Sequence, residues 1–313
     1  MSQLAEGEWN LAYYSDGLNP GADFTFGSFR SGYYLLEPFE IKYGDSDVGD
    51  VPLPREDGVR LGQDYRAGAT LTFEVGVDTV DRASTSARHD ANLDAVSVMT
   101  QAWDAESLRG RFGKPAVLRT RQGGRARCFY GRPRKCEPSS SKLTRQGYTP
   151  VIATFASVDG TAYDDVEQNI RVGMAPPPHH GLIGPLTSPL TMTGECATKV
   201  PGEIIVGGTK PAWPIITIFG PVTQPACELV GYWKVTLDLT LAAGERVAID
   251  TRPWGRTVLR NGHASVAGLL TRDSPTLKNM RLPIGRRDLV LRGKDPTATA
   301  YMIVAWRDAY TYL

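Results

Sequence analysis

Histidine and cysteine, the usual zinc ligands, number only four each and are unsuitably spaced in this 313-residue chain. The four histidines include the pair His179-His180, but His-Glu-x-x-His, the spacing that places two imidazoles on one helical face around zinc, does not occur. Cys128 and Cys136 lack a second Cys or His pair at ligand spacing. The sequence also contains neither a Gly-x-Ser-x-Gly elbow nor a Gly-x-x-x-x-Gly-Lys phosphate loop. We therefore expect a protein that is not an enzyme and that holds no metal or cofactor.

A dense group of carboxylates lies between residues 45 and 57. A helix-loop-helix calcium loop that began at Asp45 would require an oxygen ligand at position 49 and a glycine at position 50. The chain has Gly49 and Asp50 at these positions, so the spacing fails. We instead expect an acidic, proline-stiffened surface loop at a contact between subunits.

Charge is unevenly distributed along the chain, although the net charge is only +1. Residues 37–94 hold thirteen Asp or Glu against six Lys or Arg, whereas residues 111–145 hold eleven Lys or Arg and a single Glu. If copies pack head to tail, the acidic surface of one copy could face the basic surface of the next, which would steer assembly and fix its register. In a second interpretation, the arginines of residues 119–127 are only the solvated side of strands.

Nucleic-acid binding is a third interpretation of the basic segment, because a clustered basic stripe neutralises phosphates. Within its arginine-rich strands, residues 119–134, Phe129 and Tyr130 are the only interleaved aromatic residues. Two aromatic residues are too few for a base-stacking platform, so we expect no nucleic-acid recognition.

The C-terminal 115 residues or so have the pattern of a β-sandwich. Residues 234–241 alternate strictly between apolar and polar types, which is typical of a half-buried strand. Asn261-Gly262 tolerates positive φ and favours a tight hairpin. Further strands are expected within residues 211–220, 282–291 and 300–307, and no long helix fits in this region.

The N-terminal half predicts a β-rich domain with one helix. Strands are expected near residues 9–14, 24–29, 33–41, 69–77, 116–120, 125–130 and 148–158. Residues 87–109 repeat apolar side chains near helical spacing without Gly or Pro, with Ser84 among the candidate N-caps and Gly110 as the expected end. A sheet with one lateral helix is an α+β plan.

The clearest break in the chain is Pro176-Pro177-Pro178, which opens a segment rich in proline and glycine. Consecutive prolines favour an extended, semi-rigid spacer. We expect an N-terminal domain over residues 1–175, a linker over residues 176–200 and a C-terminal β-sandwich over residues 201–313.

Several segments, in order along the chain, resemble one family of viral structural proteins. They are the stretch ending in Trp-Pro-Ile-Ile-Thr-Ile-Phe-Gly at residue 220, residues 241–253 (Leu-Ala-Ala-Gly-Glu-Arg-Val-Ala-Ile-Asp-Thr-Arg-Pro) and the closing Ile-Val-Ala-Trp-Arg. These resemble the C-terminal domain of distal tail proteins of long-tailed phages (siphophages), the ring proteins that join a flexible tail tube to its tip. Residues 44–58 are also similar to minor tail proteins of phages that infect actinobacteria.

This resemblance implies a mainly β, α+β protein with a ring-forming N-terminal belt domain and a C-terminal galectin-like antiparallel β-sandwich. It implies a homo-oligomer, a ring with six-fold symmetry, that contacts the major tail tube protein, the baseplate hub or tail-associated protein, and the tape measure protein. The residues expected at the subunit interface are Asp45, Asp47, Asp50, Arg55, Glu56, Asp57, Asp90, Asp94, Arg119, Arg121, Arg125 and Arg127.

Two other functional classes stay open. Galectin-like sandwiches stack sugars on a tryptophan, and Trp254 follows Asp250 here, so a tail-tip adhesin that binds host cell-wall glycans is the alternative. Arg256 and Thr257 depart from the acidic pattern of sugar-binding galectins, which argues against this alternative. A wall-degrading enzyme would require a carboxylate pair at diagnostic spacing, and no such pair is identified.

Composition is that of an ordinary folded protein, with 41% hydrophobic and 22% charged residues. No stretch approaches the ~20 apolar residues of a membrane helix, and the N-terminus lacks a basic leader followed by an apolar run. The resemblance implies a virion tail protein that is assembled in the host cytoplasm, and the sequence predicts no membrane contact. Its four cysteines are expected to be thiols, with a Cys128 to Cys136 bridge left open.

Overall fold

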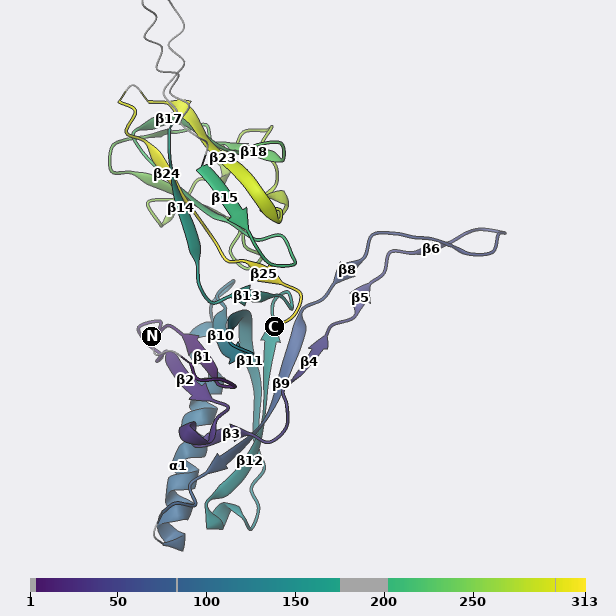
Figure 1. The fold of residues 1–313 in the computed structure, drawn as a ribbon, viewed down its shortest axis with the longest axis vertical. Coiled ribbons are helices and arrows are strands. Elements are labelled where there is room, and N and C mark those ends of the chain that lie inside the picture. Colours follow the sequence, from purple (N-terminus) through teal and green to yellow (C-terminus); the bar gives the residue numbers. More distant parts are fainter. Residues whose placement is uncertain (1–3, 83, 175–201, 296) are drawn as a thin grey trace, which may run out of the picture. The chain divides into compact units, whose positions relative to one another are not determined.

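The computed structural model describes residues 4–82, 84–174, 202–295 and 297–313 (Figure 1). The chain divides into two compact units, each with its own hydrophobic core. The first unit comprises Met1–Val166 and Ala309–Leu313, and the second comprises Glu167–Asp308.

The first unit is built on a ten-stranded antiparallel sheet with the order β2-β1-β10-β11-β12-β9-β3. β4 also pairs with β9, and β13 pairs with both β11 and β25. The strands are β1 (Trp9–Tyr13), β2 (Ala22–Phe26), β3 (Tyr33–Leu35), β4 (Glu40–Tyr43), β9 (Ala69–Asp78), β10 (Ala116–Gln122), β11 (Arg125–Pro138), β12 (Tyr148–Ser157), β13 (Ala162–Asp164) and β25 (Ala309–Tyr310). Side chains alternate in β9, where Leu71, Phe73 and Val75 are fully buried, as strand geometry requires.

One long helix, α1 (Thr85–Asp104), lies along this sheet (Figure 1). Ser84 caps it, because the Ser84 hydroxyl accepts a hydrogen bond from the Ala87 backbone N–H. Met99 and Trp103 are buried against the sheet, and the Trp103 indole N–H donates to the Thr154 carbonyl at 3.0 Å. The predicted helix was continuous over residues 87–109, but in the structure it breaks at Ala105, which has a left-handed φ of 46°, and resumes as α2 (Glu106–Arg109).

A two-stranded arm of residues 44–68 extends away from the sheet between β4 and β9 (Figure 1). It contains the short ladders β5 (Ser46–Asp47) with β8 (Tyr65–Arg66), and β6 (Val51–Pro52) with β7 (Val59–Arg60). Sequence reasoning predicted a loop here. The arm forms a ribbon because its outgoing and returning strands pair with each other.

The second unit is a β-sandwich of a six-stranded sheet, β14-β24-β16-β20-β21-β22, and a five-stranded sheet, β15-β23-β17-β18 with β19 paired to β17. Apolar residues of both sheets, such as Ile216 and Met302 of one and Leu289 and Leu291 of the other, form one core. The strands are β14 (Gln168–Gly173), β15 (Gly202–Val206), β16 (Ile215–Phe219), β17 (Val222–Leu229), β18 (Trp233–Thr236), β19 (Thr240–Leu241), β20 (Arg246–Asp250), β21 (Thr257–Arg260), β22 (Ala264–Ser265), β23 (Gly285–Lys294) and β24 (Tyr301–Trp306). Within the described ranges, short 3-10 turns are η1 (Phe29–Ser31), η2 (Thr144–Gln146), η3 (Ala267–Leu269) and η4 (Leu277–Asn279).

The predicted sandwich strands are present with one refinement. The apolar face of residues 234–241 is buried as expected, but the strand is interrupted between β18 and β19, where Leu237 instead bridges Leu270. The Asn261-Gly262 hairpin is confirmed: both residues have positive φ, 52° and 85°, between β21 and β22.

The structural units differ from the predicted domain ranges at their ends. β14 (Gln168–Gly173) pairs with β24 of the sandwich, and β25 returns to pair with β13 of the first unit. The predicted linker, residues 176–200, lies outside the described residues.

A Cys128 to Cys136 disulfide is sterically impossible in this fold. Both residues lie in β11, where eight residues span about 26 Å, whereas bridged Cα atoms lie within about 7 Å. The Cys128 thiol instead donates to the Asp164 carbonyl at 3.7 Å.

Candidate functional site: assembly surfaces of the first unit

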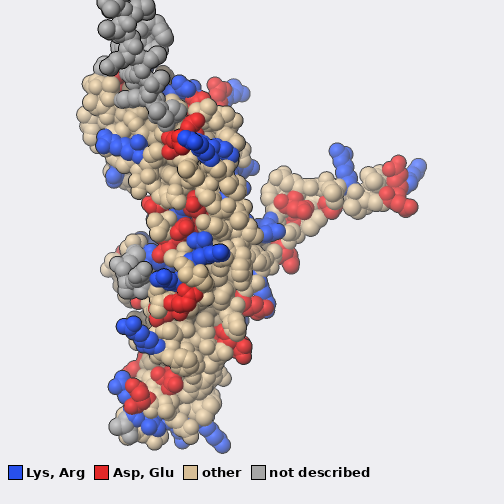
Figure 2. All heavy atoms as spheres, viewed as in Figure 1, with Lys and Arg blue, Asp and Glu red and all other residues tan. Residues whose placement is uncertain are grey.

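The arm carries six of the twelve predicted interface residues, Asp45, Asp47, Asp50, Arg55, Glu56 and Asp57, and exposes nearly all of its side chains. Between residues 45 and 67 only Asp50 and Leu53 are partly buried, and none is fully buried. Figure 2 shows acidic and basic side chains along the arm, with uncharged surface between them. Large apolar side chains, including Val51, Leu61 and Tyr65, are exposed as well. An isolated two-stranded ribbon is at best marginally stable in water, so this composition favours a covering partner.

Two glycines allow the strands of the arm to cross closely at its middle. A Cβ on Gly62 would lie 1.9 Å from the Gly49 carbonyl oxygen, a distance that no side chain tolerates. The Asp50 carboxylate accepts a hydrogen bond from the Gly62 N–H at 2.8 Å beside this crossing. Asp50, one of the clustered carboxylates whose spacing does not fit a calcium loop, therefore has a structural partner within the arm.

Helix α1 presents a second exposed surface. Asp90 and Asp94 are exposed, as are Leu93 and Val98. Residues 90, 94, 98 and 101 follow helical spacing, so they lie on one face, opposite the side chains that pack on the sheet. The two predicted aspartates thus belong to one outward-facing stripe.

The four predicted arginines of β10 and β11 fall into two pairs. Arg119 forms an ion pair with Asp165 at 2.9 Å, and Arg127 forms one with Asp164 at 3.2 Å and stacks over the Tyr310 ring. The side chains of Arg119 and Arg127 are only 16% and 10% exposed. These intramolecular contacts compensate their charges, which leaves Arg121 and Arg125 as the accessible pair.

Arg121 and Arg125 flank the tip of the β10–β11 hairpin. Gly123 and Gly124 form the turn with φ of 58° and 74°. The Glu6 carboxylate accepts hydrogen bonds from both glycine N–H groups, which fixes the tip. Arg125 is exposed at this tip.

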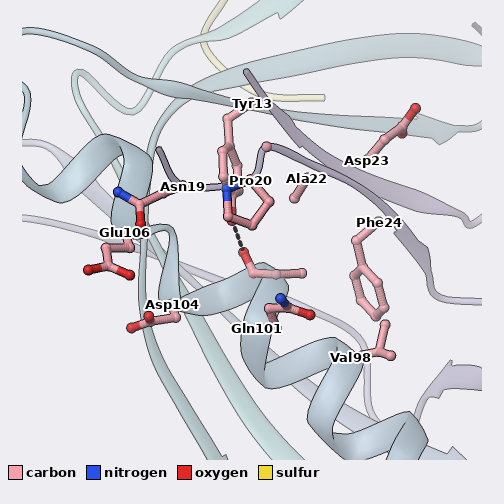
Figure 3. Close-up of a pocket in the computed structure, with 12 residues that line it drawn as sticks. Tyr13, Asn19, Pro20, Ala22, Asp23, Phe24, Val98, Gln101, Asp104 and Glu106 are labelled. Carbon is pink, nitrogen blue, oxygen red and sulfur yellow. Dashed lines mark hydrogen bonds between the residues drawn. The ribbon is translucent and has the colours of Figure 1, made fainter. Parts of the chain in front are cut away.

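A groove of about 370 Å³ lies between β2, the loop before it and the end of α1 (Figure 3). Its polar lining includes Asp23, Gln101, Asp104 and Glu106. The Tyr13 hydroxyl donates to the Ala102 carbonyl at 2.9 Å across its floor. Burial raises the pKa of this phenol, and the nearby Asp104 charge raises it further, so Tyr13 stays a neutral donor.

Sequence reasoning missed this groove. Residues 13–24 and 98–106 are far apart in sequence, and only the β1–β2 hairpin and the placement of α1 bring them together. The one available signal was the closely spaced pair Asp104 and Glu106 near the end of the predicted helix.

The tryptophan considered for sugar binding lies in the second unit. The Arg252 guanidinium lies 5.5 Å from the Trp254 ring centroid and forms an ion pair with Asp250 at 2.7 Å. Arg281 similarly stacks on Trp213 at 4.3 Å. These arginines cover part of the ring faces that a sugar would use.

Within residues 4–82, 84–174, 202–295 and 297–313, no three His, Cys, Asp or Glu side chains are grouped to hold a metal ion. No helix in this part of the chain combines the length and apolar character needed to cross a bilayer.

Comparison with known proteins identifies the fold. No protein-family model and no curated protein match the sequence. The crystal structure of the SPP1 Dit protein, described as a paradigm of the hub adsorption apparatus in phages that infect Gram-positive bacteria, aligns with a TM-score of 0.56 at 11% identity. That alignment covers 96% of this chain and 98% of the SPP1 protein.

Two structures of the phage P2 baseplate in its activated conformation, with Ca and with Sr, align with TM-scores of 0.49 and 0.47. Their identities are 8% and 10%, and each alignment covers 98% of this chain and 99% of the other. The fold assignment rests on the SPP1 alignment, which spans both units. The predicted mainly β plan with one helix is confirmed, and the chain has a Dit-like fold.

Proposed function

We propose that this protein is a non-enzymatic structural component of a phage tail, a ring at the distal end of the tail that joins the tail tube to the tip or baseplate. The observation that carries the proposal is the Dit-like fold over nearly the whole chain. The similarity of residues 44–58 to minor tail proteins of actinobacterial phages favours an actinobacterial host.

The mechanism is geometric. A heterologous contact, in which one surface of a copy meets a different surface of the next, generates a closed ring when the rotation between copies closes. The first unit offers separate surfaces for such a contact: the arm, the acidic face of α1 and the basic hairpin tip. Its partners would be copies of itself, six in a ring, with the tube protein on one side, the hub protein on the other and the tape measure protein in the lumen.

The exposed apolar side chains of the arm support this proposal most directly. Its exposed apolar side chains gain burial only if another surface covers them, and each covered side chain such as Leu61 would contribute about 1–2 kcal/mol. Covering the arm with a neighbouring copy would explain why a ribbon without its own core is maintained.

The test is to image the purified full-length protein by negative-stain electron microscopy and to measure its mass in solution. We expect closed rings and a mass of six times 34.1 kDa. Rings of another copy number would replace the six-fold symmetry, whereas single copies at every concentration would contradict self-assembly.

A further inference from the structure

The groove beside β2 has the features of a docking site that the chain does not fill itself. β2 lies at one end of the strand order, and the chain just beyond it is bridged to β3 at Gly27. The open edge beside the groove is therefore the first half of β2, residues 22–24, which can accept a further strand. Asp23, Asp104 and Glu106 line the groove, and none of its lining residues is Lys or Arg. The exposed Val98 and the apolar body of Phe24 complete the lining.

The carboxylates of the groove are only partly compensated within the unit. Asp104 pairs with Arg109 at 2.9 Å, and Asp23 accepts a hydrogen bond from the Asn10 amide at 2.6 Å. Glu106 is exposed in the first turn of α2 and has no partner among the described residues. At about 370 Å³ the groove lies at the lower end of the ~300–1,000 Å³ range of binding pockets, a size that suits a few side chains.

The chain contains a segment complementary to this groove, the basic hairpin tip at residues 121–125. Arg125 is exposed there, and no described residue pairs with its guanidinium. The bonds from Gly123 and Gly124 to Glu6 hold the tip in one conformation, so docking would require little ordering.

One copy cannot place its own hairpin tip in its own groove. The register Ala12↔Val117 puts the groove end of β1 beside the start of β10, and Trp9↔Thr120 puts the other end beside the hairpin tip. The seven residues of β10 span about 20 Å between these ends. The two surfaces face opposite ends of the same strands, which is the arrangement that a head-to-tail contact requires.

We propose that the hairpin tip of one copy docks in the groove of a second copy, with the Arg125 guanidinium beside Asp104 and Glu106. Asp23 points to the other face of β2, toward Asn10, and lies outside this contact. This proposal rests on the proposed ring function and adds which two surfaces meet. Docking would also cover Leu18, which is 94% exposed in the loop before β2.

Charge reversal tests the contact in the full-length protein. Arg125→Glu and Glu106→Arg are each expected to weaken self-association about tenfold or more, measured by sedimentation velocity at low salt. The double variant is expected to associate more tightly than Arg125→Glu alone, because the reversed charges attract again. Lys142→Glu and Glu74→Arg change exposed charges elsewhere on the first unit and are expected to change association less than twofold.

Each outcome decides a different point. If the wild-type protein does not associate, the ring function and this contact fail together. If the wild type associates but the two reversals act like the controls, or if the losses in the double variant simply multiply, the contact is wrong and the ring function stands. Thermal melts of all variants show whether each remains folded.

Discussion

Asn92 is a buried polar side chain that ties helix α1 to the sheet. Its amide donates to the carbonyls of Val77 at 3.1 Å and Gly147 at 3.0 Å, and its oxygen accepts from the Thr149 hydroxyl at 2.5 Å. The residue is fully buried, so each of these bonds is made away from water. The position of α1, and with it the acidic stripe and the groove, depends on this network.

Replacing Asn92 should therefore be costly. Asn92→Ala removes three buried hydrogen bonds and is expected to lower the free energy of unfolding by about 2–3 kcal/mol. The loss stays within this range because the Gly147 carbonyl keeps its bonds from Thr79 and the Thr149 hydroxyl keeps Thr144. Chemical denaturation measures this loss. Ser97→Ala, on the exposed face of the same helix, should stay within about 0.5 kcal/mol of the wild type. Equal stability of the two variants would show that the network does not hold the helix.

Cys227 gives the sandwich a pH dependence of definite sign. Complete burial raises the pKa of its thiol far above the ordinary value, and the Glu228 charge raises it further. Below a pH of about 8.5 the thiol is protonated in both the folded and the unfolded chain, so it contributes no pH dependence. Above that pH only the unfolded chain loses the proton, and the free energy of unfolding falls by up to about 1.4 kcal/mol per pH unit.

Cys227→Ala removes this titration. The variant is less stable at every pH because of the cavity, but between pH 8.5 and 10 its unfolding free energy should fall less steeply than that of the wild type. Denaturation curves at several pH values provide the comparison. Parallel slopes would mean that the thiol ionises equally in the folded state.

Among residues, sequence reasoning located charges better than it located their partners. Exposed Asp90 and Arg125 agree with the expectation of charged surfaces. Arg119 and Arg127 looked identical to Arg125 in the sequence, yet they form ion pairs with Asp165 and Asp164. No local pattern reports a partner almost forty residues or more away, because the pairing depends on which strands become neighbours.

At the scale of elements, apolar alternation predicted the buried faces of the strands, and a capping residue predicted the start of the helix. Strands such as β9 and β12 carry their apolar face in the sequence, and Ser84 marks the start of α1. The left-handed break at Ala105 was not predictable, because alanine favours a continuous helix. The break lets α2 turn so that Ser107 and Leu108 are buried.

The arm was predicted as a loop because its ladders are too short to show alternation. Each ladder pairs only two residues per strand. The strands that pair in these ladders are close in sequence. The feature that distinguishes this ribbon from a loop is the close approach of Gly49 and Gly62, and the sequence does not reveal that these two glycines face each other. The acidic content of the segment, in contrast, was evident from the sequence.

Removing the arm should weaken self-association while leaving the stability of the fold unchanged. In a variant with residues 45–67 replaced by Asn-Gly, the chain still connects Gly44 to Gly68, which already share a backbone hydrogen bond of 2.9 Å. None of the removed residues is buried, so the melting temperature should change by no more than about 2 °C. Self-association, followed by sedimentation velocity, should weaken at least about tenfold. Unchanged association would exclude the arm from the contact between copies.

At the scale of the whole molecule, the sequence indicated two β-rich parts, and the fold comparison confirms the mainly β plan. The path of the chain between the parts was not predictable. β25 adds to the first unit although it follows the sandwich in sequence, and only the β13–β25 pairing reveals this. Nonlocal pairing of this kind leaves no periodic signal in the sequence, because strands of three and two residues are too short to show alternation.

The most direct measurement of the tail-ring role is to locate the protein on intact particles of the phage that encodes it. Gold-labelled antibodies raised against the sandwich unit and viewed by electron microscopy would report its position. The proposed role predicts label at the distal end of the tail, at the junction with the tip. Label on the capsid, or particles that carry no label at the tail end while a known virion protein is labelled in parallel, would contradict it.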